Sequence, residues 1–182
     1  MKNRILLYAV VVFQVAVIGA IALSKGYTRL TGRKIMVKVV PVDPRSLFRG
    51  DYVILKYDFS TVDLAKHGFK DEVPPRGEYL FLTLKRGPEG FWALESVSPE
   101  FPDTGTGDDG IVVRGLIANE ARFSKRADFI FGIESYFVPE GEGKYIEKYR
   151  EKKELSAEIA VDRYGRAALS KLFIAGKEVR FD

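Results

Sequence analysis

The chain has 182 residues, of which 46% are apolar and 30% are charged, with one His and no Cys. This composition suits one globular domain with an appendage and argues against wholesale disorder. Without Cys the chain can form no disulfide, thiolate zinc site or Cys nucleophile, and one His cannot build a multi-His metal cluster. We therefore expect neither a cofactor nor a metal site.

The formal net charge of +4 is distributed unevenly along the chain. Seven of the 29 basic residues and no acidic residue precede Asp43, so residues 43–182 hold 29 − 7 = 22 basic residues against 25 acidic ones. A nucleic-acid-binding protein carries its basic stripe on the folded domain, whereas here the basic residues flank an apolar segment. The charge pattern favours a membrane surface over nucleic acid as the partner.

The first predicted element is a membrane-spanning helix over Ile5–Leu23. These nineteen residues carry no charge, and a helix of this length reaches ~28 Å, about the thickness of the hydrocarbon core of a bilayer. A buried helix of a soluble protein would show a polar stripe, which this segment lacks. We predict that residues 1–34 form a membrane anchor followed by a basic connector, Ser24–Lys34, with the lipid bilayer as the partner of Ile5–Leu23.

Two properties of this anchor have competing interpretations. Ala20-Ile21-Ala22 has the small-x-small form that a signal peptidase accepts, but no more polar stretch precedes it, so we favour a retained anchor over a cleaved signal peptide. Lys2 and Arg4 are typical of a signal anchor with an exported domain, whereas five basic residues after the helix favour a cytoplasmic domain under the positive-inside rule. We expect a single-pass protein of the cell membrane with an extracytoplasmic domain.

Residues 35–182 are predicted to form one mainly-β domain, a sandwich or barrel-like fold with one short helix. Short apolar or alternating runs between Gly- and Pro-rich turns are typical of strands. The helix is expected at Gly141–Lys153, and the period of two in Leu155–Val161 predicts a strand with one buried face. Strands are predicted at Ile35–Val40, Tyr52–Phe59, Glu78–Lys85, Phe91–Val97, Ile111–Ile117, Asp128–Val138, Leu155–Val161 and Ala167–Ile174, with a hairpin loop at Arg86–Gly90 and a longer loop at Ser98–Gly110.

A turn-and-strand pattern, R-G-[D/E]-Y-x-x-L, occurs twice, at Arg49–Leu55 and Arg76–Leu82. In each copy Gly can adopt a positive φ, and the acid that follows can accept backbone N–H groups of the turn. The aromatic residue and Leu fall on opposite faces, as in an interior strand of a sandwich or barrel. We hypothesise that Gly50 and Asp51 fix the turn that delivers Tyr52–Tyr57 into the core. The repeat itself is equally compatible with a duplicated hairpin and with coincidence.

The first copy is part of the longer pattern Gly50-Asp51-Tyr52-x-x-Leu55-x-Tyr57, and a second block follows at Phe131–Gly141. Together with Asp43–Arg49, these segments resemble the GDYXXLXY family of small bacterial membrane-anchored proteins over most of residues 35–176. The resemblance implies one N-terminal anchor, a β-rich domain and an accessory role, because members accompany or are fused to multi-pass membrane proteins. The motif residues with an expected structural or binding role are Arg45, Arg49, Gly50, Asp51, Tyr52, Leu55, Tyr57, Glu134, Tyr136 and Glu140.

An enzymatic function is the alternative. Leu47–Val53 is similar to the end of the signal-peptidase box, whose Ser nucleophile is activated by Lys, yet Val42 stands at the nucleophile position. Asp51, Glu134 and Glu140 are acids that a carboxylate-dependent hydrolase could use. Because no catalytic constellation is visible, we favour a membrane-tethered accessory or binding module that serves an integral membrane protein. A degenerate signal-peptidase relative or a carboxylate-dependent hydrolase of unknown reaction remains the competing interpretation.

Overall fold

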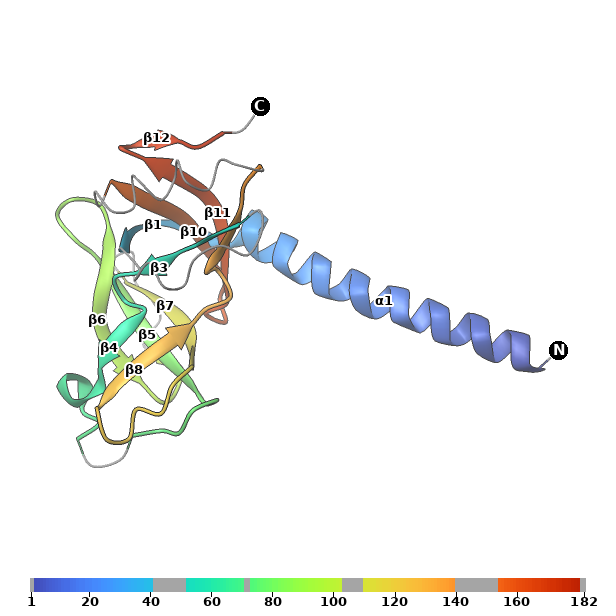
Figure 1. Ribbon diagram of the computed structural model, residues 1–182, viewed down its shortest axis with the longest axis horizontal. Helices are drawn as coiled ribbons and strands as arrows, with labels where there is room; N and C mark the ends of the chain where they lie inside the picture. Colours follow the sequence, from blue (N-terminus) through green and yellow to red (C-terminus); the bar gives the residue numbers. More distant parts are fainter. Residues whose placement is uncertain (1, 41–51, 71–72, 103–109, 140–153, 181–182) are drawn as a thin grey trace.

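The computed structural model describes residues 2–40, 52–70, 73–102, 110–139 and 154–180. They form one long helix, α1 (Lys2–Thr31), and a β domain from which this helix projects (Figure 1). The remaining elements are β1 (Arg33–Val40), β2 (Tyr52–Ile54), β3 (Lys56–Tyr57), β4 (Thr61–Asp63), the 3-10 helix η2 (Leu64–His67), β5 (Tyr79–Arg86), β6 (Trp92–Ser98), β7 (Gly110–Ile117), β8 (Arg126–Ile130), β9 (Ser135–Phe137), β10 (Leu155–Val161), β11 (Ala167–Ile174) and β12 (Lys177–Glu178).

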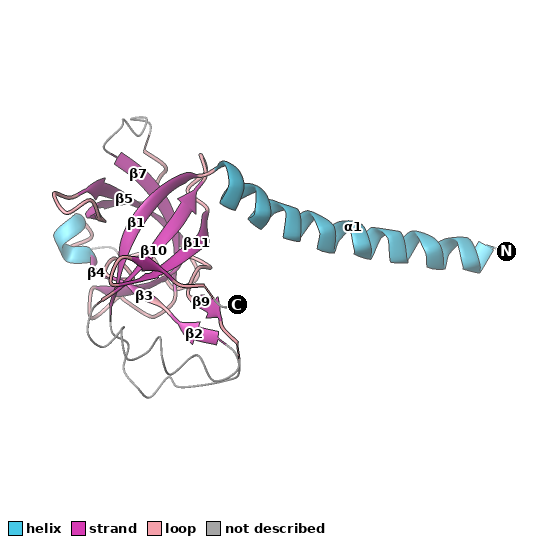
Figure 2. Ribbon diagram, turned by 90° about the horizontal axis from the view of Figure 1, so that it is seen from above, coloured by secondary structure: helices cyan, strands magenta, loops and turns pink. Residues whose placement is uncertain are grey.

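Two five-stranded antiparallel sheets make up most of the domain, in the orders β12-β11-β10-β1-β3 and β4-β8-β7-β5-β6. A two-stranded sheet, β2-β9, lies near the β3 edge of the first (Figure 2). Both large sheets contribute to one continuous core, in which Ile35, Val37, Leu82, Val113 and Ile159 are each at most 2% exposed. The predicted mainly-β class is confirmed, with the core between the sheets.

The hairpin between β5 and β6 is confirmed at the predicted loop. The two strands pair antiparallel, and the N–H of Gly87 donates to the carbonyl oxygen of Phe91 at 2.8 Å. Gly90 has a φ of +83°, a conformation that residues with a Cβ resist. Strands β1, β6, β7, β10 and β11 also lie within two residues of their predicted bounds.

The predicted strand Tyr52–Phe59 is instead two short strands, β2 and β3. They separate at Leu55, whose N–H donates to the carbonyl oxygen of Glu134 at 2.7 Å. Among the described residues β2 pairs with β9 and β3 lies at the end of its sheet, which differs from the interior position expected for this copy of the repeat. The second copy, β5, does lie between β7 and β6, but its outer face is only partly buried, and Tyr79 is 50% exposed.

The predicted strand Asp128–Val138 is also two strands, β8 and β9. They are separated by a turn over residues 131–134, the β8–β9 turn, in which Gly132 has a φ of +76°. Three short elements were not predicted: β4, η2 and β12 each span two to four residues, too few for a periodic pattern to show.

Strand β10 buries both faces, so the prediction of a single buried face is wrong. Leu155, Ala157, Ile159 and Val161 face the core as expected, but on the other face all residues except Glu158 are buried as well. The strand lies between β11 and β1 and is also contacted by the end of α1. An alternating apolar pattern reveals one buried face of a strand, but it does not reveal whether the other face is buried as well.

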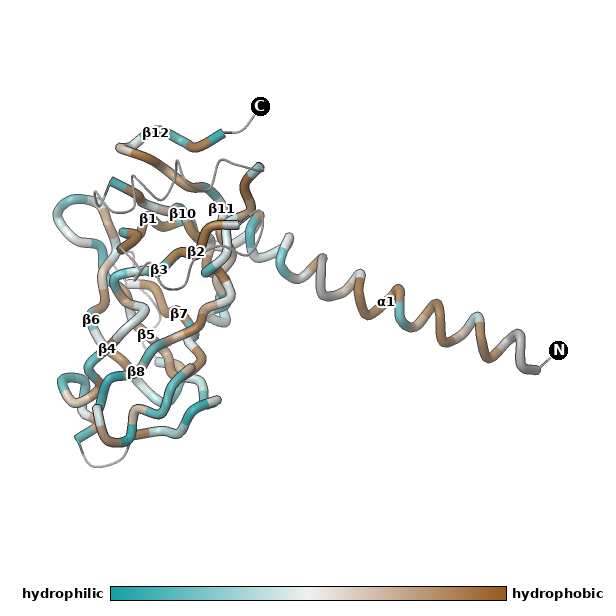
Figure 3. Tube along the Cα trace, in the orientation of Figure 1, coloured by the Kyte–Doolittle hydropathy of each residue, from teal (hydrophilic) through white to brown (hydrophobic). Residues whose placement is uncertain are grey.

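Helix α1 has two parts with different surroundings. From Leu6 onward its apolar side chains point outward, and Leu6, Val12, Phe13 and Ile18 are each 67–68% exposed. Figure 3 shows this apolar stretch projecting beyond the domain. The helix is long and apolar enough to cross a membrane.

The second part of α1 runs into the predicted connector. Within Ser24–Lys34 the helix continues to Thr31, and β1 begins at Arg33. The N–H of Gly32 donates to the carbonyl oxygen of Thr28 at 2.9 Å and ends the helix. The predicted helix Gly141–Lys153 and residues 103–109 of the predicted loop lie outside the described residues.

Candidate functional site

The last residues of the GDYXXLXY motif lie in the core. Leu55 and Tyr57 are each 1% exposed. The hydroxyl of Tyr57 donates to the carbonyl oxygen of Ile133 at 2.6 Å, and its ring stacks on that of Phe59 with centroids 5.5 Å apart. Burial, helped by the carboxylate of Glu134, raises the pKa of Tyr57 far above its usual range. Tyr57 is therefore a neutral hydrogen-bond donor inside the core.

The two sequence blocks that carry the family resemblance are paired in space. In the β2-β9 ladder Val53 lies opposite Tyr136. The carboxylate of Glu134 accepts the N–H groups of Phe131 at 2.5 Å and Gly132 at 2.9 Å. Because each carboxylate oxygen holds one backbone N–H of the β8–β9 turn, Glu134 serves this turn and is poorly placed as a general acid or base.

The first residues of the motif lie outside the part of the chain that the structure describes. This holds for Arg45, Arg49, Gly50, Asp51 and Glu140, whereas the backbone of Tyr52 begins β2. The structural hypothesis for Gly50 and Asp51 stays a prediction.

The second copy of the repeat offers a partial comparison. Gly77 has a φ of +91°, as the turn requires. No described residue donates to the carboxylate of Glu78. Instead, the N–H of Gly77 and the carbonyl oxygen of Glu78 bond to the backbone of Ile117, each at 2.9 Å. In this copy the main chain holds the turn, without help from the acid.

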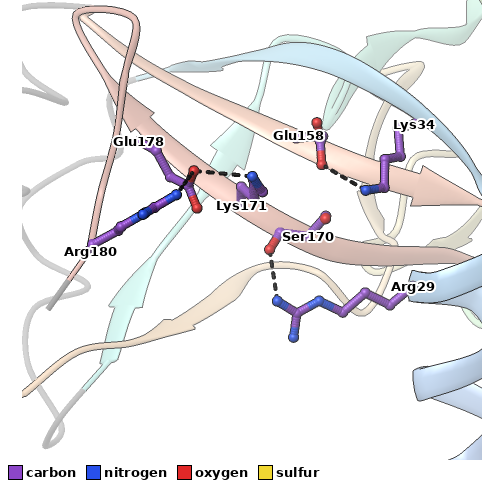
Figure 4. A network of polar contacts seen from close by, with 7 residues as sticks. All are labelled: Arg29, Lys34, Glu158, Ser170, Lys171, Glu178 and Arg180. Atoms are coloured by element: carbon purple, nitrogen blue, oxygen red, sulfur yellow. Dashed lines mark hydrogen bonds and ion pairs between the residues drawn. The ribbon is translucent and has the colours of Figure 1, made fainter. Parts of the chain in front are cut away.

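Tyr136 lies near charged groups of α1 and β12. Partial burial raises the pKa of Tyr136, while the guanidinium of Arg29 opposes the shift and the carboxylate of Glu178 adds to it. Glu178 in turn accepts from Lys171 and Arg180, each at 3.0 Å (Figure 4). Hydrogen bonds from these two cations lower the pKa of Glu178. The charges of Glu178, Lys171 and Arg180 are thus paired with one another, and we propose no catalytic or binding role for them.

The last turns of α1 are hydrogen-bonded to the domain at three places. The hydroxyl of Thr28 donates to Asp162 at 3.1 Å. The guanidinium of Arg29 donates to the carbonyl oxygen of Ser170 at 3.0 Å (Figure 4), and the ammonium of Lys25 donates to a carbonyl oxygen of the β8–β9 turn at 3.3 Å. The helix is thus attached along its side to the β10–β11 turn, β11 and the β8–β9 turn.

Gly32 allows the end of α1 and the end of β10 to approach each other closely because it has no side chain. A Cβ at this position would lie 2.5 Å from the carbonyl oxygen of Thr28 and 2.9 Å from the nitrogen of Val161. Both are backbone atoms, which cannot move aside as a side chain can. The close approach of helix and sheet therefore requires glycine.

Asp162 organises the β10–β11 turn at the same junction. One carboxylate oxygen accepts the N–H groups of Tyr164 and Arg166, both at 2.9 Å, and the other accepts Nε of Arg166 at 2.7 Å as well as the Thr28 hydroxyl. Desolvation raises the pKa of Asp162, but the hydrogen bonds from Arg166 and Tyr164 outweigh it and lower the pKa overall. Asp162 is held ionised.

Two pockets flank the end of α1. The first, the α1–β8 pocket, has a volume of about 290 Å³ and lies between α1, the start of β5, β7, β8 with its turn, and the start of β11. The second, of about 360 Å³, lies on the side of β1 and the β10–β11 turn. The cationic side chains of this region, here named the basic collar, are Lys25, Arg29, Arg33, Arg114, Arg163 and Arg166.

Aromatic rings are interleaved with the basic collar. The guanidinium of Arg114 lies 4.5 Å from the ring centroid of Tyr79, and that of Arg163 lies 4.7 Å from that of Tyr164. Tyr79 and Tyr164 are about half exposed. Cationic and aromatic side chains together are typical of the membrane–water interface, where an amphipathic ring is stable.

Within the described ranges no three His, Cys, Asp or Glu side chains gather in a way that could hold a metal ion. What the described surface offers chemically is a concentration of positive charge around the end of α1. Sequence reasoning pointed to the motif and missed this region. The basic residues after the anchor and the turn at Asp162–Gly165 were visible, but nothing local showed that Arg114 would join them.

The fold and site define a β domain carried on one long apolar helix and attached to it through a basic junction. A model of the GDYXXLXY protein family matches residues 14–172, most of the chain, and the chain belongs to this family. The match runs from the middle of α1 into β11. In the same comparisons neither a curated protein nor a solved structure matches the chain.

Proposed function

We propose that this protein is a membrane-tethered accessory module: α1 crosses the cell membrane once, and the β domain is held at the bilayer surface to serve an integral membrane partner. The observation that supports this proposal is that α1 is one unbroken helix from its apolar part to the domain. The described residues of its apolar part are not buried against the domain, while its last turns are hydrogen-bonded to the domain. Such a helix orients the domain, whereas a flexible linker would not.

The distance between bilayer and domain supports a role beside the membrane. The apolar run ends at Leu23, and Lys25 already contacts the domain. Two residues of helix correspond to about 3 Å. The domain therefore begins at the level of the headgroups, within reach of the surface loops of a membrane protein.

Gln14 supports a partner within the bilayer. It is the strongly polar residue of the predicted span, its side chain is exposed, and no described residue bonds to its amide. Amides in transmembrane helices commonly bond to a neighbouring helix, and each such contact contributes about 0.6–2 kcal/mol. A second helix, from another protein or a second copy of this chain, would satisfy this amide.

We propose an extracytoplasmic position for the domain. Lys2 and Arg4 supply the positive-inside signal at the N-terminus. Of the competing basic residues, Lys25 and Arg29 donate to carbonyl oxygens of the domain, so their presence has a structural reason independent of topology.

Cysteine labelling tests this orientation on a chain that has no native Cys. Lys66→Cys, at an exposed site of the domain, should react with a membrane-impermeant maleimide in intact cells, and Asn3→Cys should react only after lysis. The reverse pattern would place the domain in the cytoplasm.

A photo-crosslinking amino acid at position 14 tests the accessory role in native membranes. We expect one discrete adduct there and a weaker one at Val15, which lies 100° away on the helix. The mass of the adduct separates a heterologous membrane protein from a second copy of this chain. Crosslinks to lipid alone at both positions would contradict a helix partner.

A further inference from the structure

We propose that the α1–β8 pocket binds the phosphate of an anionic phospholipid headgroup, with Lys25, Arg114 and Arg166 as its cationic ligands. This inference rests on the proposed membrane span of α1. It adds a ligand class and a site to that proposal.

The pocket lies where phospholipid phosphates are found. Lys25 and Thr28 of α1 line it, and they follow within five residues of Leu23, the end of the apolar run. Five residues of helix rise about 7.5 Å. Thr28 therefore lies about 7.5 Å beyond the edge of the hydrocarbon core, which is within the headgroup region. The anion most abundant at this level of a membrane is a lipid phosphate.

Positive charge converges on the pocket with little compensation. The ammonium of Lys25 bonds to a backbone carbonyl oxygen, and the guanidinium of Arg114 packs on the ring of Tyr79. Neither has a carboxylate partner among the described residues. Asp162 binds Nε of Arg166 at 2.7 Å. Charge-assisted hydrogen bonds from such cations to phosphate oxygens are among the strongest in proteins.

The fold brings these three cations together from distant segments. The N–H of Arg114 in β7 donates to the carbonyl oxygen of Gly165 at 2.8 Å, which joins β7 to the β10–β11 turn that carries Arg166. Lys25 reaches the same pocket from α1 and bonds across to the β8–β9 turn. One backbone hydrogen bond and one hydrogen bond from the Lys25 ammonium therefore hold the walls of the pocket together.

The remaining wall of the pocket distinguishes a lipid from a free anion. Leu116, Ile130 and Phe131 line it, and Ile130 is 47% exposed. Inorganic phosphate would gain nothing from these apolar side chains, whereas the glycerol and the upper acyl chain of a phospholipid can cover them. Cations and apolar side chains, of which Ile130 is the exposed one, line the same pocket and fit an amphipathic anion.

The test measures lipid binding to the full chain in detergent micelles by native mass spectrometry. We expect phosphatidylglycerol to bind at least about tenfold more tightly than phosphatidylcholine, and Lys25→Gln or Arg114→Gln to weaken phosphatidylglycerol by about tenfold, the equivalent of one charged hydrogen bond. Arg86→Gln is the matched control, because Arg86 is exposed at the opposite end of β5 from Tyr79 and loses the same charge. It should bind as the wild type does.

Three results would overturn the assignment: equal affinity for both lipids, equal weakening in Arg86→Gln, or displacement of the lipid by millimolar inorganic phosphate. Circular dichroism establishes that each variant is folded. If Arg114→Gln does not fold, Lys25→Gln decides the outcome, because Lys25 contacts the domain through a single carbonyl oxygen. Loss of lipid preference with the position-14 crosslink intact would reject this site and leave the accessory role standing.

Discussion

Replacing Tyr57 by Phe tests whether the end of the family motif is a structural element. The substitution keeps the ring and its stack on Phe59 but removes the hydroxyl, which leaves the carbonyl oxygen of Ile133 without its donor at 2.6 Å. Removing one partner of a buried hydrogen bond costs about 1–3 kcal/mol of unfolding free energy. At roughly 2–4 °C per kcal/mol for a chain of this size, Tm should fall by at least about 2 °C.

The same hydroxyl predicts a difference at high pH. Because burial raises the pKa of Tyr57, the unfolded chain ionises this group near the ordinary value of about 10 while the folded chain keeps it protonated. Above pH 10 the unfolded state therefore binds fewer protons, and stability falls by up to about 1.4 kcal/mol per pH unit on account of this group. Below pH 10 this contribution is constant. Tyr57→Phe should lose stability less steeply above pH 10 than the wild type.

Urea unfolding of the full chain in detergent, followed by circular dichroism at pH 7 and pH 11, measures both effects. Tyr27→Phe is the control, because Tyr27 is 63% exposed and no described residue bonds to its hydroxyl. The reasoning is refuted if Tyr57→Phe unfolds at the wild-type urea concentration at pH 7 and loses stability in parallel with the wild type at pH 11.

Three further substitutions test the turn, the core and the junction. Glu134→Ala frees two backbone N–H groups and should lower the unfolding free energy by about 1–3 kcal/mol, with Glu134→Gln costing less; thermal melts that match the wild type would contradict this. Gly115→Ala places a Cβ 2.8 Å from two core aromatic rings and should cost about 1–3 kcal/mol in urea unfolding, whereas Gly110→Ala in the same strand meets open space. Gly32→Ala should loosen the attachment of the helix to the domain and speed limited proteolysis after residue 25. Gly26→Ala is the control, because a Cβ there meets nothing within 4 Å, and it should not speed cleavage. Equal cleavage of the two variants would show that the junction tolerates a side chain.

The parts of the fold that follow from local patterns were predictable. Alternation at Ile35, Val37 and Val39 marks β1, and each of these side chains is at most 2% exposed. The uncharged run after Arg4 marks the apolar part of α1. Gly90 marks the hairpin between β5 and β6 through its turn conformation. In each case the signal lies within a few residues of the element it specifies.

What could not be predicted depends on contacts between distant segments. The break at Leu55 exists because its N–H bonds to Glu134, 79 positions further along. The second buried face of β10 depends on the end of α1 and on neighbouring strands. Such contacts leave no trace in periodicity.

The candidate site divides in the same way. The family motif identified Leu55 and Tyr57, which lie in the core, because a fixed spacing of aromatic and aliphatic residues is visible in a sequence. The basic collar was invisible as a unit. Arg114 and Arg166 are brought to the same pocket by one backbone hydrogen bond, from Arg114 in β7 to Gly165 in the β10–β11 turn. No spacing of residues along the chain predicts this hydrogen bond.

The central claim, that α1 anchors the mature protein in the membrane, is tested most directly by alkaline extraction of native membranes with N-terminal sequencing of the recovered protein. We expect the protein to stay in the membrane pellet and its N-terminus to precede Ile5. A protein released into the supernatant with an N-terminus at Leu23 would show that the helix is a cleaved signal and not a membrane anchor.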